Sequence, residues 1–439
     1  MALKTFTIDF SELAIDPKVG LKDYSCLYKN GIRLKSLLLN QNVQTSIKSG
    51  RTPSRFNEKY WNGKNEFLTM SDVDTITFSI NSECVDKITD YAVEEERTLY
   101  QAKQNSLIVS NAMTVGLSFL LDRPVFINQN VFEVNLDETK VNKKFVLWYL
   151  NIIIRPLFQT TFTSKYLSKD ELGRIKIPYI EKEIQDRVVA QIEPIEKIIK
   201  ELKAQVTQTQ QVIKNVFARK FGFDLEKFEN SKKKFFKLNF SDISKNNDLK
   251  LNVSSNLNCL NNFQIDHVNY YRIRSISKNI FPGGDMPINF SEIQDDVYRF
   301  PIYSNGVRNL GIVGYSKIAR VEEEATTISA RGTIGFAVAR NDNYLPVVRL
   351  ISVIPNTNII LNEYLAYVLN FQNIENSGNT IPQLTVPMVE NIIIPVPSLK
   401  IQQKIVDEIK NEINNQDEIK KKIEKERCKI DKIIKDVII

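Results

Sequence analysis

The chain has 439 residues, of which 42% are hydrophobic and 25% are charged, so a mainly disordered protein is excluded. Its length predicts two or three domains. The 59 basic and 52 acidic residues give a net charge of +7, which is compatible with a nucleic-acid partner without requiring one. No apolar run reaches the ~18 residues that span a bilayer, and no signal-peptide pattern begins the chain. We therefore expect a cytoplasmic protein.

Cysteine and histidine usage exclude several kinds of chemistry. The four cysteines stand far apart and form no CxxC pair, which argues against a zinc site or a disulfide framework. His267 is the only histidine, and we expect it to be structural or at the surface. The sequence has no phosphate-binding glycine loop and no paired prolines of the kind found in adenine-N6 methyltransferases. We expect no catalytic residue, no metal and no cofactor in this chain.

Four segments of the first half are echoed in the second half, in the same order. The pairs are residues 6–13 with 236–243, 109–116 with 328–335, 145–151 with 364–370, and 163–192 with 380–409. The period exceeds 200 residues. The pattern therefore predicts one duplicated module of two parts and not a solenoid of short repeats.

Each module begins with a globular part of mixed structure. Short β-rich runs, such as residues 75–80 and 347–354, alternate with turns that contain glycine. The echoed segments that begin at Phe145 and Tyr364 predict one helix in each globular part.

A long amphipathic helix follows each globular part. Apolar residues recur at steps of three and four from Val188 to Val216 and again from Ile401 to Val437. Pro194 is the only proline in either stretch, and we expect it to kink or restart the first helix. Helices of this kind need a partner for the apolar stripe, and the other copy is the simplest one. The predicted arrangement is an intramolecular coiled coil that joins two globular domains, with a homodimeric coil as the alternative.

Polar and basic loops in the globular parts are the remaining candidates for function. Their residue types suit DNA, because arginine matches guanine edges, asparagine matches adenine, and small hydroxyls hold phosphates. Each loop alone could be an ordinary exposed turn, but loops in both copies favour a shared surface role. The candidate DNA-binding residues are Ser49, Arg51, Thr52, Ser54, Arg55, Tyr60, Trp61, Ser110, Asn111 and Lys165 in the first module, and Tyr303, Ser304, Asn305, Arg308, Ser329, Arg331 and Thr333 in the second.

Three stretches together resemble a known family. They are residues 49–54 with 60–63, residues 329–335, and the hinge 392–399 that leads into the second long helix. With the duplication, they make the whole chain similar to the specificity subunit of type I restriction-modification systems. The resemblance implies that two target recognition domains each bind one half of a bipartite DNA site. It also implies that the two long helices pack antiparallel and bind the partner subunits.

The resemblance implies an α+β fold with two mixed α/β target recognition domains, two long antiparallel coiled-coil helices and a pseudo-twofold repeat. The expected boundaries are 1–182 and 231–399 for the recognition domains, and 183–230 and 400–439 for the helices. The implied partners are double-stranded DNA, two modification (methyltransferase) subunits and restriction (translocase) subunits. The modification subunits would bind S-adenosylmethionine and transfer the methyl group, and the restriction subunits would carry translocation and cleavage. The globular parts differ in length, and the first copy lacks a counterpart of Arg331, so two unlike half-sites are implied.

Three other functions stay open from the sequence. The chain could be an enzyme, either a nuclease or a fragment of a DNA methyltransferase, although the absent motifs argue against both. It could be a coiled-coil scaffold with two protein-binding heads, which would lack salt-dependent affinity for DNA. It could also be the specificity subunit of a related methylation-based defence system.

Overall fold

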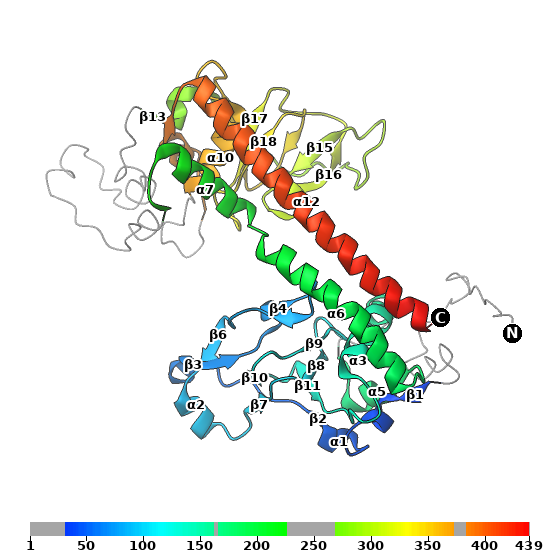
Figure 1. The fold of residues 1–439 in the computed structure, drawn as a ribbon. Helices are drawn as coiled ribbons and strands as arrows, with labels where there is room; N and C mark the ends of the chain where they lie inside the picture. Colours follow the sequence, from blue (N-terminus) through cyan, green and yellow to red (C-terminus); the bar gives the residue numbers. More distant parts are fainter. Residues whose placement is uncertain (1–30, 162–165, 226–267, 373–382, 439) are drawn as a thin grey trace. The chain divides into compact units, whose positions relative to one another are not determined.

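The structure is a computed structural model that describes residues 31–161, 166–225, 268–372 and 383–438. Two compact units divide the chain (Figure 1). Unit 1 comprises Met1–Gln205 with Ile419–Ile439, and unit 2 comprises Val206–Glu418. Within the described residues, no helix is long and apolar enough to cross a membrane.

Unit 1 contains two principal sheets. The six-stranded sheet has the order β2 (Ile47–Lys48), β11 (Val131–Val134), β8 (Leu107–Ser110), β9 (Ser118–Leu120), β5 (Ser79–Ile80) and β4 (Val73–Asp74). The four-stranded sheet has the order β6 (Asp86–Ile88), β3 (Trp61–Phe67), β10 (Val125–Ile127) and β7 (Tyr100–Ala102). Strands β8 and β11 are buried along their whole length, as expected for apolar runs covered on both faces. A separate two-stranded antiparallel sheet pairs β1 (Ile32–Arg33) with β12 (Lys176–Ile177).

Helices cover the six-stranded sheet of unit 1. Helix α3 (Lys143–Tyr149) starts at Asn142, whose side chain caps two backbone N–H groups, and it continues through a π-helical turn into α4 (Arg155–Thr161). Figure 1 shows α3 between this sheet and α6 (Lys182–Ala204). The remaining helices of this unit are α1 (Val43–Ser46), α2 (Asp90–Glu95) and α5 (Lys169–Arg174).

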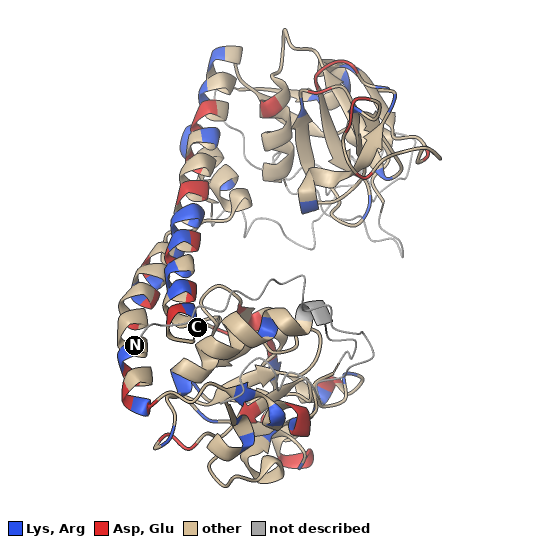
Figure 2. Cartoon of the chain, turned by 90° about the vertical axis from the view of Figure 1, so that its right-hand side faces the viewer, with Lys and Arg blue, Asp and Glu red and all other residues tan. Residues whose placement is uncertain are grey.

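The last part of the chain completes the core of unit 1. It belongs to α12 (Leu399–Ile438), along which basic and acidic residues are interspersed (Figure 2). Ile423, Ile430 and Ile434 are buried, and the Arg427 guanidinium lies 4.5 Å from the ring centre of Trp148. Burial lowers the pKa of Arg427, although it also forms an ion pair with a carboxylate one turn away. The C-terminal residues of the chain therefore help to hold the N-terminal domain together.

Unit 2 repeats the two-sheet plan with fewer strands. One sheet has the order β14 (Ser277–Pro282), β20 (Leu350–Pro355), β17 (Ala325–Ser329) and β18 (Ala337–Arg340). The other has the order β16 (Ile312–Ser316), β15 (Phe300–Tyr303) and β19 (Leu345–Pro346), and β13 (Asn269–Arg272) pairs with β21 (Ile393–Val396). The helices are α7 (Thr209–Phe221), α10 (Asn362–Gln372), α11 (Val386–Glu390) and the first half of α12.

Helix α7 packs antiparallel to the first half of α12 inside unit 2. Near the start of α7, the Thr207 N–H donates to the Gln416 side chain at 2.7 Å, and at its end Arg219 forms ion pairs with Glu408 and Glu412. The contacts move toward lower residue numbers in α12 as the residue numbers in α7 increase, so the two helices run antiparallel. Phe217 of α7 is fully buried in the apolar core of the unit.

The predicted duplication is confirmed at the level of single hydrogen bonds. Asn151 exchanges two hydrogen bonds with the Ser118 backbone, at 3.0 and 2.6 Å, and thereby fastens the helical segment that follows α3 to β9. Asn370 exchanges two bonds with the Ala337 backbone, at 3.0 and 2.7 Å, and fastens α10 to β18. Both asparagines are buried, and they occupy the same place in the echoed segments.

A second echoed position has the same contact in both units. The Gln185 side chain of α6 accepts from the Asn142 N–H at 2.9 Å, and the Gln402 side chain of α12 accepts from the Leu361 N–H at 2.8 Å. Each glutamine is buried near the start of its helix. The predicted helices in the globular parts are confirmed as α3 and α10. The echo at residues 6–13 and 236–243, together with His267, lies outside the described residues.

The first long helix differs from the expectation in two respects. Helix α6 continues through Pro194, because both Pro194 and Ala190, whose carbonyl the proline leaves free, are exposed to water. The helix ends instead at Ala204, and α7 starts at Thr209. The β-branched Val206 and Thr207 favour helix weakly, and the Thr207 N–H is taken by Gln416 of α12.

The expected strand at residues 75–80 was also largely wrong. Only Ser79–Ile80 is extended, because the Asp74 carboxylate accepts from the N–H groups of Ile76 and Thr77 and closes a turn there. In the second module, the strand expected at 347–354 begins at Leu350, after a turn at residues 348–349.

Candidate nucleic-acid interface

The turn between β10 and β11 holds two candidate loops of unit 1 together. The Thr52 N–H and hydroxyl both donate to the Gln129 side-chain carbonyl, at 3.2 and 2.9 Å. The Asn111 side chain donates to the Gln129 backbone carbonyl at 3.0 Å, and the Asn111 N–H donates to the Asn130 carbonyl at 3.0 Å. Loops 49–55 and 110–116 therefore meet on one two-residue turn.

Glycine allows the first of these loops to approach the sheet. A Cβ atom added to Gly50 would lie 1.9 Å from the Ile127 carbonyl oxygen of β10, which no side chain can tolerate. The loop beyond Gly50 presents Arg51, which is exposed and has no partner within the described residues.

The end of the same loop folds onto an aromatic platform. The Trp61 indole N–H donates to the Ser54 carbonyl at 3.0 Å, and the Arg55 guanidinium lies 3.8 Å from the centre of the Trp61 ring. Arg55 also pairs with the Asp86 carboxylate, so its charge is partly neutralised. Between these residues Phe56 is fully exposed. Single-stranded or flipped bases commonly stack on such exposed rings, whereas an intact duplex presents phosphates and base edges.

Two lysines of unit 1 lie close together near these loops. Lys48 directly precedes the first loop, and Lys169 follows Leu167, whose N–H donates to the Asn111 carbonyl at 2.8 Å. Burial and the neighbouring Lys48 charge both lower the pKa of Lys169. Two adjacent cations are the arrangement that a phosphate stabilises. The pair has no signature in the sequence, because more than a hundred residues separate its members.

Four hydrogen bonds hold the candidate loops of unit 2 together. Asn305 donates to the Arg331 carbonyl at 3.0 Å, and the Gly306 N–H donates to the Ser329 hydroxyl at 3.3 Å. The Ser304 hydroxyl donates to the Val348 carbonyl at 3.3 Å, and the Ala330 N–H donates to the carbonyl of the following residue, 349, at 2.8 Å. The loops at 304–311 and 329–335 thus meet at the turn between β19 and β20.

This turn in unit 2 corresponds to the turn between β10 and β11 in unit 1. The loops that rest on the two turns also match, since Gly116 donates to the Ser110 carbonyl at 2.8 Å and Gly335 donates to the Ser329 carbonyl at 2.9 Å. Both glycines have φ +81°, which glycine adopts without strain. We refer to each set of two loops and one turn as a loop junction.

The candidate residues differ in what their side chains can reach. Those that are exposed are Arg51, Ser54, Arg55, Arg308 and Thr333, and those that are partly buried are Ser49, Thr52, Tyr60, Trp61, Ser304, Asn305 and Arg331. Arg331 already donates two hydrogen bonds to the Gln383 side chain, at 3.1 and 2.7 Å. Lys165 lies outside the described residues.

Four candidates need a different role, because their side chains are buried. Ser110, Asn111 and Ser329 form hydrogen bonds inside the loop junctions. Tyr303 donates to the Asp342 carboxylate at 2.9 Å beneath the Arg340 guanidinium, and burial raises its pKa to about 12. The structure therefore gives these four side chains a positioning role and leaves surface contact to their neighbours.

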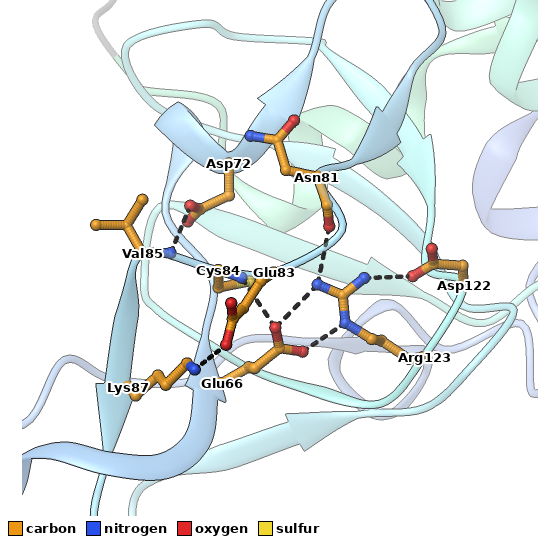
Figure 3. A network of polar contacts seen from close by, with 9 residues as sticks. All are labelled: Glu66, Asp72, Asn81, Glu83, Cys84, Val85, Lys87, Asp122 and Arg123. Atoms are coloured by element: carbon orange, nitrogen blue, oxygen red, sulfur yellow. Dashed lines mark hydrogen bonds and ion pairs between the residues drawn. The ribbon is translucent and has the colours of Figure 1, made fainter. Parts of the chain in front are cut away.

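A polar network of unit 1 around Arg123 and Glu66 is structural (Figure 3). Arg123 binds the Glu66 carboxylate and the Asn81 carbonyl, and Glu66 accepts from the Cys84 N–H at 2.8 Å. The hydrogen bond from Arg123 lowers the pKa of Glu66, and burial raises the pKa of Cys84 to about 12. The Cys84 thiol is therefore protonated at neutral pH and is a poor nucleophile. The network braces the turn at residues 81–85 against β3.

Comparisons with known proteins agree with the duplication. The family model for the type I restriction modification DNA specificity domain matches residues 43–208 and again residues 266–426. Two Mycoplasma pneumoniae proteins named as type I specificity subunits, S.MpnORF507P and S.MpnORF89P, are each 38% identical to this chain, over 135 and 136 residues. Each alignment covers 31% of this chain and 37% or 40% of the relative.

Solved structures of similar fold align over nearly the whole length. The S subunit of a type I restriction-modification system from M. genitalium aligns with 93% of this chain and 96% of its own, at 16% identity and a TM-score of 0.47. The family match, which covers most of both modules, carries the assignment. The chain belongs to the type I restriction-modification DNA specificity family.

Proposed function

We propose that this chain is the DNA-reading specificity subunit of a type I restriction-modification complex and supplies no catalytic group itself. Unit 1 binds one half of a bipartite duplex target, and unit 2 binds the other half. The observation that carries the proposal is the pair of loop junctions, which share their backbone hydrogen bonds but present different side chains. A common scaffold with exchangeable surface residues is suited to two different DNA sequences.

The side chains at the two loop junctions favour an asymmetric target. The junction of unit 1 presents Arg51, Thr52 and the exposed amide of Gln129. The junction of unit 2 presents Arg308 and Thr333, with Arg331 beside them. Amides match adenine and arginines match guanine in the major groove, so the two half-sites differ in sequence.

The remaining parts of the complex are assigned on the family relationship. We place the recognition domains at 1–182 and 231–399 and the spacer helices at 183–230 and 400–439, with the first spacer interrupted between α6 and α7. Two modification subunits bind this chain and provide methyl transfer from S-adenosylmethionine, and restriction subunits add translocation and cleavage. Within the described residues, no group of three or more histidine, cysteine or acidic side chains is placed to hold a metal ion.

Reconstitution of DNA methylation tests the proposal. The purified chain alone, the modification subunit alone and the two together are incubated with genomic DNA and S-adenosylmethionine, and methylated adenines are mapped by sequencing. We expect methylation at one bipartite sequence only when both proteins are present. Methylation by the chain alone would show that this chain is itself an enzyme and would refute the proposal. Normal assembly without any sequence preference, and without salt-dependent DNA affinity, would favour a scaffold.

A further inference from the structure

The turn between β19 and β20 carries a side chain that its structural role does not use. The carbonyls of Val348 and Arg349 fix the two loops of unit 2. The Arg349 side chain is exposed, and it forms no hydrogen bond or ion pair with any residue that the structure describes. Its guanidinium is therefore free to bind a ligand at the centre of the loop junction.

The backbone at this position is strained. Arg349 has φ +71°, a region that residues other than glycine and asparagine rarely occupy. Over the described part of unit 2, the non-glycine residues with positive φ are Asn309, Leu310 and Arg349, and all three belong to the loop junction. Such strain is concentrated at ligand-binding sites, where the surrounding structure holds a side chain in a fixed direction.

The corresponding turn of unit 1 shows that the strain is not required by the turn itself. Asn130 occupies the equivalent position, and its carbonyl accepts the equivalent hydrogen bond from Asn111. Asn130 has an ordinary negative φ, although asparagine tolerates a positive one better than arginine does. A glycine at position 349 would also make the turn without strain. The presence of arginine there is explained by a function of its side chain.

We infer that Arg349 is a specificity-determining residue that contacts a base in the half-site bound by unit 2. The inference rests on the proposed DNA-reading function. The matching chemistry is a guanine edge, whose O6 and N7 atoms accept the two parallel N–H groups of the guanidinium. A phosphate contact would need only the positive charge, whereas a base contact needs the direction that the fixed backbone provides.

Three substitutions at Arg349 separate these possibilities. Arg349→Gly removes the side chain and relieves the strained φ, so the protein should remain folded. Arg349→Lys keeps the charge but loses the planar pair of donors, and Arg349→Asn imports the residue found in unit 1. Arg274→Ala is the matched control, because Arg274 is also exposed in unit 2 but lies in a short helical turn outside the loop junction.

Each variant is assembled with the modification subunit and used to select from a random library of duplex DNA. For Arg349→Gly and Arg349→Lys we expect the preference at one base pair of one half-site to fall roughly 5- to 150-fold, which is the discrimination of one bidentate contact. The other half-site should be unchanged, and Arg274→Ala should select the wild-type sequence.

Three results would overturn the inference. Equal loss of affinity for all sequences with Arg349→Gly, accompanied by a smaller salt dependence, would make Arg349 a phosphate contact. An unchanged selection would exclude contact with DNA. Loss of preference in the other half-site would assign Arg349 to a different role. If the wild-type complex itself selects no sequence, the proposed function fails, and this outcome is distinct from the other three.

Discussion

Replacing Gly50 with alanine should disable recognition by unit 1 without unfolding the chain. The added Cβ would lie 1.9 Å from the Ile127 carbonyl oxygen, and real Cβ contacts are essentially never shorter than 3.0 Å. Backbone atoms of β10 cannot yield easily, so the loop must retreat by about 1.1 Å, the difference between these two distances. The Thr52 hydrogen bonds to Gln129 start at 3.2 and 2.9 Å and would exceed 3.5 Å.

The energetic cost follows from the lost contacts. Each neutral hydrogen bond contributes about 0.5–1.5 kcal/mol, and an overpacked site costs about 1–3 kcal/mol, although retreat of the loop relieves part of the second cost. We expect Gly50→Ala to lower the free energy of unfolding of unit 1 by roughly 2–4 kcal/mol. Because the junction is displaced, discrimination should be lost in one half-site only.

Urea unfolding and selection from random duplex DNA measure the two effects. Gly222→Ala is the control, since its Cβ meets no atom within 4 Å and only its φ of +70° disfavours alanine. The control should lose about 1–2 kcal/mol from backbone strain and keep both half-sites. If Gly50→Ala keeps wild-type stability and discrimination in both half-sites, the reasoning that joins the loop to β10 is refuted.

Three further predictions concern single side chains. Arg51→Ala and Arg308→Ala should each weaken binding to one half-site, by about 1–3 kcal/mol of binding free energy if a base contact is lost. Competition with half-site variants measures this, and an equal loss at both half-sites would contradict it. Asn370→Ala should destabilise unit 2 by about 2–5 kcal/mol in urea unfolding, because it leaves a buried N–H and carbonyl unpaired, and a loss below 1 kcal/mol would exclude that role. The raised pKa of Cys84, about 12, leaves even less thiolate at pH 8 than a free cysteine has, so iodoacetamide should modify the exposed Cys428 before Cys84. Peptide mapping that finds Cys84 modified before Cys428 in the folded protein would contradict its burial.

The duplication could be predicted from the sequence because the echoed segments occur in the same order in both halves of the chain. Asn151 and Asn370 are the last residues of the echoed segments 145–151 and 364–370, and Gln185 and Gln402 stand near the start of matching helices. Their hydrogen bonds to the backbone are made once the chain folds, so the same residue at the same place predicts the same contact. The helices α3 and α10 followed from this pattern.

The end of the first long helix depended on a contact with a distant segment. Periodicity continued through residues 205–208, and Pro194 was the only local signal of a break. Helix α6 passes Pro194 and ends at Ala204, and Gln416 accepts a hydrogen bond from the Thr207 N–H in the segment that follows. A hydrogen bond between residues about two hundred positions apart has no local signature, so helix propensity alone misplaced the interruption.

The loop junctions likewise exist only in three dimensions. Sequence composition marked Thr52 and Ser329 as candidates, but it could not distinguish a surface contact from an internal hydrogen bond. Burial makes Ser329 a support for its loop, and the turns at Gln129 and Arg349 become important because distant loops rest on their carbonyls. Local sequence determined which residues have side chains of the types that suit DNA, whereas tertiary packing decided which of them face the solvent, because exposure depends on all the segments that cover a residue.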